Sequence, residues 1–118
     1  MGDVAVERGT IPLPKTVRGL MESPLGSSIL TRLAVADVSV LITDSVRVAS
    51  WSKAVVINGH GFELQMRPYE ADGSLHEKLF RTPLSIEDAL AYIRQLNGAE
   101  VVEEDLVRAI VHRVPDYL

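Results

Sequence analysis

The sequence contains no cysteine, and this absence excludes disulfide bonds, thiolate catalysis and cysteine-ligated zinc sites. It also has no run approaching the ~20 apolar residues that a membrane-spanning helix requires, because Asp37 and Asp44 interrupt its richest apolar stretch. The first residues, MGDVAVERG, carry acids where a signal peptide would carry positive charge and then an apolar run. We therefore expect a cytoplasmic protein.

Thermolabile side chains are scarce as well. There are only two asparagines and two glutamines, and arginine outnumbers lysine nine to three. Scarcity of thermolabile residues is typical of proteins from heat-adapted organisms, although a GC-rich genome would produce the same arginine bias. The composition therefore favours, without requiring, a heat-adapted source.

The net charge of −4 argues at first against a nucleic-acid partner. The charges are unevenly distributed, however. Residues 44–82 carry five basic and five acidic side chains, whereas residues 83–118 carry three basic and seven acidic ones. The central segment is therefore neutral and can still present a basic face.

A chain of 118 residues predicts a single domain, residues 1–118, with a modest core. Residues 1–13 are expected to form a loose N-terminal arm, since Pro12 and Pro14 mark its end. The hydrophobic content of 47% is high for this size, so some apolar surface should be left over. Self-association is the usual way to bury such surface, and we therefore expect a homo-oligomer.

Two N-terminal helices are predicted, the first over residues 15–22. Ser23 then provides an N-cap for the second helix, and proline follows at the first helical position, where its missing N–H costs nothing. In this second helix Leu25, Ile29 and Leu33 recur every four residues, which indicates a stripe that faces the core.

The central segment predicts an antiparallel sheet of three to five strands. Residues 37–43 alternate β-branched and polar side chains, which favours a strand over a helix in this ambiguous stretch. The sequence NGHG at 58–61 is a hairpin signal that precedes the alternating strand FELQMR. Pro68 cannot donate a backbone hydrogen bond, so strand pairing should fail near it. A further strand is expected at 75–81, after the turn at 71–74.

Two C-terminal helices complete an α+β fold in which helices at both ends of the chain pack on the central sheet. The first of them begins after the capping residue Ser85 and ends at Gly98. The second spans about residues 101–114 and stops before Pro115.

The last helix has an apolar sector that is wider than packing on one sheet requires. Part of it is therefore expected to contact a second subunit through Val107, Val111 and Val114. The alternative, which the pattern supports equally, is that this helix lies in the core of its own chain.

The residue types of catalysis and metal binding are present but poorly arranged. The three histidines, His60, His76 and His112, have neither the spacing of a metal-binding helix nor a neighbouring catalytic partner. The serines lie in no nucleophile pattern, and Asp72-Gly73-Ser74 lacks the ligands of a calcium loop. We therefore expect a protein that is not an enzyme and that needs no cofactor or metal.

Aromatic and basic residues lie close together in the central segment, where Trp51, Tyr69 and Phe80 each have a basic residue within two positions. Bases stack on aromatic rings for ~1–3 kcal/mol each, and neighbouring basic groups hold phosphates. The aromatic rings would equally suit a core whose basic neighbours are merely solvated. The candidate nucleic-acid-binding residues are Arg47, Trp51, Lys53, Arg67, Tyr69, Lys78, Phe80 and Arg81.

Residues 62–96, FELQMRPYEADGSLHEKLFRTPLSIEDALAYIRQL, resemble the strand–turn–strand–helix of the positive-cofactor-four class of single-strand binders. That class has a second strand rich in lysine and glycine, whereas this chain has only Lys78 and Arg81 there. By the order of its elements, the whole chain also resembles the ThermoDBP-related proteins of heat-loving archaea. This resemblance implies binding of single-stranded DNA on a sheet cradled by helices, in a cleft of aromatic residues edged with basic ones.

The leading hypothesis is therefore sequence-independent binding of single-stranded nucleic acid, with DNA favoured and RNA left open. Two alternatives stay open at this point. One is a homo-oligomeric protein-interaction module without a nucleic-acid role, and the other is a small regulatory subunit that binds a metabolite between the sheet and the helices.

Overall fold

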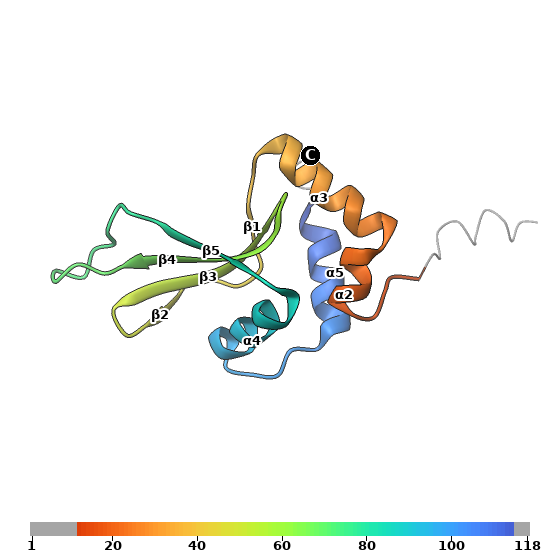
Figure 1. Cartoon of the computed structure of the whole chain (residues 1–118). Coiled ribbons are helices and arrows are strands. Elements are labelled where there is room, and N and C mark those ends of the chain that lie inside the picture. Colours follow the sequence, from red (N-terminus) through yellow and green to blue (C-terminus); the bar gives the residue numbers. More distant parts are fainter. Residues whose placement is uncertain (1–11, 115–118) are drawn as a thin grey trace, which may run out of the picture.

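The computed structural model of the chain describes residues 12–114, and the α+β fold is confirmed there: a five-stranded antiparallel sheet is combined with four helices (Figure 1). The predicted N-terminal arm lies almost entirely outside the described residues. The helices are α2 (Val17–Glu22), α3 (Pro24–Ala36), α4 (Ile86–Asn97) and α5 (Glu103–Arg113). The strands are β1 (Val40–Leu41), β2 (Val46–Val48), β3 (Trp51–Asn58), β4 (Gly61–Pro68) and β5 (Phe80–Leu84).

Ser23 joins the two N-terminal helices and serves both of them. Its hydroxyl donates to the carbonyl of Leu20 in α2 at 2.6 Å and accepts from the backbone N–H of Gly26 in α3 at 3.1 Å. The predicted N-cap, followed by proline at the first helical position, is therefore confirmed.

The core stripe predicted for α3 is correct at Ile29 and Leu33 but wrong at Leu25, which is exposed. The buried position of that first turn is Gly26 instead. A Cβ at Gly26 would overlap the backbone of Leu20, so α2 and α3 approach more closely here than any larger residue allows.

The strand predicted at 37–43 is shorter than expected. Helix α3 continues until Asp37, which ends it in a left-handed backbone conformation with φ 53°. The N–H groups of Ile42 and Thr43 then both donate to the carbonyl of Val55, which interrupts the pairing of β1 with β3. After this bulge the chain pairs with β3 again as β2.

The hairpin predicted at residues 58–61 is confirmed, and it pairs β3 with β4 along their full length. The strands divide their side chains between two faces, because side chains alternate along a strand and directly opposed residues share a face. The core face carries Val55, Ile57 and Leu64, which belong to the hydrophobic core. The opposite side carries Ser52, Ala54, Val56, Glu63, Gln65 and Arg67. We call it the open face because, among the described residues, the helix-covered core does not pack on it, although its Ser52, Ala54, Val56 and Glu63 are buried.

Pairing of β4 with β5 ends at Met66 and Phe80, two residues before Pro68, as its missing N–H predicts. The strand expected at 75–81 is therefore displaced and begins only at Phe80. An isolated bridge between Tyr69 and Leu75 closes the turn beyond it. Residues 76–79 bulge out of the sheet, because these four residues lie opposite only two residues of β4, 67 and 68.

The two C-terminal helices begin and end close to the predicted positions. Ser85 caps α4 by accepting from the N–H of Asp88 at 3.1 Å, and Gly98 ends it with φ 68°. The last helix, α5, packs against α2. Val107 of this helix and Val114, which follows its last residue, are 0% and 1% exposed. The interface expected from these two valines is therefore corrected: they belong to the chain's own core, and only Val111 is half-buried.

The core lies at one end of the sheet. Helices α3 and α5 lie beside the β3–β4 hairpin, and α2 packs against these two helices (Figure 1). Helix α4 lies against the core face, whereas β2 and the opposite ends of β3 and β4 project beyond the helices. We call this projecting part the free end of the sheet. Within residues 12–114 no helix is both long and apolar enough to cross a membrane.

Candidate nucleic-acid interface

The residues predicted to bind nucleic acid are divided between the two faces of the sheet, because the strand register sends neighbouring candidates to opposite sides. Lys78 contacts the ring of Phe80, and Arg47 contacts the ring of Tyr69. The core face at the free end carries Trp51, Lys53 and Phe80. The open face carries Arg47, Arg67 and Arg81.

Trp51 and Phe80 form an aromatic pair on the core face of the free end. Their ring centroids lie 5.6 Å apart at an interplanar angle of 77°, which is the favoured edge-to-face arrangement. The ammonium of Lys78 lies 4.8 Å from the centre of the Phe80 ring, and Lys53 follows Trp51 by two residues on the same face. We call these four residues the stacking cluster.

The stacking cluster is partly open to solvent. Phe80 is 37% exposed, and Trp51 and Lys53 are half-buried. The half-buried Val46, Val48 and Met66 pack against the hydrophobic core, but within the described residues neither ring of the aromatic pair does. The two rings therefore support each other at the free end and do not fill the core.

Arg47 and Arg67 flank Ser52 on the open face, because both are register partners of this serine. The guanidinium of Arg47 lies 4.3 Å from the centre of the Tyr69 ring, and its Nε donates to the carbonyl of Ala49 at 3.1 Å. Arg67 takes part in none of the ion pairs between described residues. Arg47 is thus held in place, whereas Arg67 projects from an exposed position.

Arg81 has a fixed position, because its partner is a buried carboxylate. Its Nε donates to Glu63 at 2.9 Å, and the Glu63 side chain is only 11% exposed. Gln65 and Asn58 donate to the same carboxylate at 2.8 and 3.3 Å. Burial alone would raise the pKa of Glu63, but the hydrogen bonds from Arg81, Gln65 and Asn58, with the charge of Arg81, outweigh it and lower this pKa.

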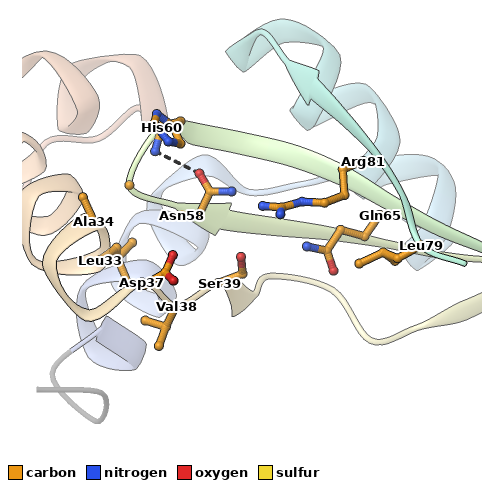
Figure 2. Close-up of a pocket in the computed structure, with 11 residues that line it drawn as sticks. Leu33, Ala34, Asp37, Val38, Ser39, Asn58, His60, Gln65, Leu79 and Arg81 are labelled. Carbon is orange, nitrogen blue, oxygen red and sulfur yellow. Dashed lines mark hydrogen bonds between the residues drawn. The ribbon is translucent and has the colours of Figure 1, made fainter. Parts of the chain in front are cut away.

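A groove made of two compartments lies over the open face, beside the end of α3 and against Leu75 and Leu79. Its larger compartment, of about 430 Å³, is lined by polar and apolar side chains from α3, the β3–β4 hairpin, β4 and β5 (Figure 2). Its smaller compartment, of about 240 Å³, lies between Leu41, Leu75 and Arg67. Gln65 and Leu79 line both compartments, so the two adjoin each other.

The sequence predicted part of this arrangement. Alternation in FELQMR placed Glu63, Gln65 and Arg67 on one face, and the register confirms this. It did not reveal that Arg81 joins Glu63, because the two residues are 18 positions apart and meet only through the register of β5. Asn58 and Asp37 were likewise not recognised as groove residues.

Residues 12–114 contain no group of three or more histidine or acidic side chains that is able to hold a metal ion. Comparison with protein-family models, curated proteins and solved structures gives no match for this chain.

Proposed function

We propose that this protein binds single-stranded nucleic acid without sequence preference, with DNA favoured over RNA, and that the bases stack on Trp51 and Phe80. The observation that supports the proposal most strongly is the stacking cluster itself. It combines two aromatic rings outside the core with two lysines at the part of the sheet that projects beyond the helices. Aromatic faces bind any base, and lysine binds phosphate as a point charge, so this combination suits sequence-independent recognition.

The structure narrows the set of residues that can act together. A strand lying on the core face of the free end cannot also touch Arg47, Arg67 or Arg81, because their side chains leave the opposite face. We therefore assign base stacking to the aromatic pair and the phosphate contacts to Lys53 and Lys78. The logarithm of the binding constant for a single strand falls with the logarithm of salt concentration by ~0.7 for each phosphate that the protein neutralises. Two lysines therefore predict a slope of about −1.4.

The experiment compares oligo-dT with a duplex of equal length at several salt concentrations. We expect the single strand to bind more tightly, because the bases of a duplex are already stacked and paired. Lys53→Gln and Lys78→Gln should each bring the salt slope closer to zero by about 0.7. Lys15→Gln is the matched control, since Lys15 is the remaining lysine of the chain and lies before α2, at the helical end.

Equal affinity for duplex and single strand, or a salt slope that neither stacking-cluster lysine changes, would contradict the proposal. Self-association remains a separate prediction. Because Val107 and Val114 are buried, a contact through α5 would have to use Val111 and the exposed side chains around it.

A further inference from the structure

The groove on the open face differs from the stacking cluster in its chemistry. Its larger compartment brings together a guanidinium from Arg81, a carboxylate from Asp37 and the neutral polar side chains of Ser39, Asn58 and Gln65 (Figure 2). Its smaller compartment has an apolar wall formed by Leu41, Leu75 and Leu79, and the polar side chains of Ser45, Ser52 and Arg67 line the rest of it. The groove therefore has a charged end and a continuation with one apolar wall.

Arg81 presents its guanidinium to this groove in a fixed orientation. Its Nε is bound by the buried Glu63, and the two Nη groups form no hydrogen bond with the part of the chain that the structure describes. A guanidinium held at Nε by a carboxylate keeps two N–H groups side by side for a second, planar anion. Glu63 thus positions Arg81 as the anion-binding group of the compartment.

Asp37 supplies an opposite charge on the facing wall. It takes part in none of the ion pairs between residues 12–114, so its carboxylate lies more than 4.0 Å from every cation there. The hydrogen bond and charge of Glu63 are the main causes that raise the pKa of Arg81, and the charge of Asp37 adds to them. The two side chains therefore face the same space without closing it.

We propose that this groove binds a free α-amino acid with an apolar side chain. The ligand's carboxylate accepts from the Nη groups of Arg81, its ammonium donates to Asp37, and its side chain passes Leu79 towards Leu41 and Leu75 in the smaller compartment. The larger compartment, of about 430 Å³, lies at the small end of the ~300–1,000 Å³ of typical small-molecule sites. This inference does not rest on the stacking cluster, which lies on the other face of the sheet.

The balance of charge selects this ligand over a phosphate chain. In the larger compartment the carboxylate of Asp37 and the adjoining carboxylate of Glu63 are opposed by the guanidinium of Arg81, whereas the guanidinium of Arg67 lines the smaller compartment. A simple anion would meet repulsion from Asp37, and a simple cation would leave the Arg81 Nη groups without a new partner. A zwitterion satisfies both side chains and adds no net charge.

The test uses three probes that differ by one charged group each. L-leucine carries both groups, 4-methylpentanoate lacks the ammonium, and 3-methylbutylamine lacks the carboxylate. Calorimetric titration of the full chain should show L-leucine binding at least about tenfold more tightly than either analogue. Equal binding of the three probes, or no binding of L-leucine, L-isoleucine, L-valine or L-methionine at about 10 mM, overturns the proposal.

Two variants separate the roles of the charges. Asp37→Asn should weaken L-leucine about tenfold or more while leaving 4-methylpentanoate bound at least as well as before, because only the ammonium loses its partner. Asparagine suits the left-handed backbone of this position, so the fold should persist. Arg81→Gln should abolish binding of both carboxylates, and Arg47→Gln, on the same face but outside the groove, should change neither.

If Asp37→Asn weakens L-leucine and 4-methylpentanoate equally, the assignment of the ammonium to Asp37 is wrong. Oligo-dT binding provides the independent readout. It should be the same with and without L-leucine, so failure of the amino-acid site and failure of the stacking cluster are distinguishable.

Discussion

Replacement of Glu63 by glutamine should destabilise the protein by about 1–2 kcal/mol at pH 7. The carboxylate accepts hydrogen bonds from Asn58, Gln65 and Arg81. Glutamine keeps the shape but replaces one acceptor oxygen by a donor, which must face at least one of these donors. A hydrogen bond to a charged group contributes about 1.5–3 kcal/mol, and the lower range applies here because the Arg81 side chain is 54% exposed and can regain water.

The assay is urea denaturation at equilibrium, with an unchanged slope as the sign that only stability has altered. Glu77→Gln is the matched control, because Glu77 is exposed and belongs to none of the ion pairs between described residues. It should change the free energy of unfolding by no more than about 0.5 kcal/mol.

The stabilisation should also depend on pH in a defined direction. The pKa of Glu63 is lowered in the folded protein, so on acidification the unfolded chain takes up this proton first. The stabilisation that ionised Glu63 contributes is therefore complete above the ordinary glutamate pKa of about 4.3. It is lost as the pH falls through the lower pKa that Glu63 has in the folded protein. The difference between wild type and Glu63→Gln should stay constant from pH 7 to about 5 and shrink below about 4. A difference that grows in acid, or that is absent at pH 7, would refute this account of the network.

Two further substitutions test the packing. Gly26→Ala should cost about 1–3 kcal/mol in the same denaturation assay, because its Cβ would overlap the backbone of Leu20, and an unchanged stability would show that α2 and α3 are not in close contact. Val107→Glu should cost more than about 4 kcal/mol of stability or prevent folding, because it buries an unpaired charge in the core. Val111→Glu changes a half-buried position and should leave the chain folded. Equal effects of the two substitutions would contradict the placement of α5.

The parts of the fold that follow from local chemistry were predictable from the sequence. Ser23 and Ser85 cap helices, Gly98 ends one, and residues 58–61 turn a hairpin, each because a side chain or a glycine suits one backbone geometry. Leu25 was misplaced because periodicity alone does not show that two helices meet at the neighbouring glycine.

Features that depend on distant residues were not predictable in the same way. The alternation at 37–43 was real, since Val40 and Ile42 are buried and Leu41 is exposed. The strand nevertheless breaks, because the consecutive N–H groups of Ile42 and Thr43 both donate to the carbonyl of Val55 on β3.

The candidate site shows the same limit. Proximity in sequence placed Phe80 beside Arg81, but neighbouring residues of a strand point to opposite faces, so a single predicted site became a stacking cluster and a groove. The long-range partners that position Arg81 were beyond the reach of sequence spacing.

The most direct test of the proposed function is a fluorescence titration of Trp51, the only tryptophan of the chain, with oligo-dT. If bases stack on this ring, its emission should be quenched on binding. Trp51→Ala should lose ~1–3 kcal/mol of binding energy while remaining close to wild-type stability, because the ring is outside the core. Unchanged emission at saturating oligo-dT, or a Trp51→Ala protein that binds normally but loses the ~3–5 kcal/mol of stability typical of a buried tryptophan, would contradict the account.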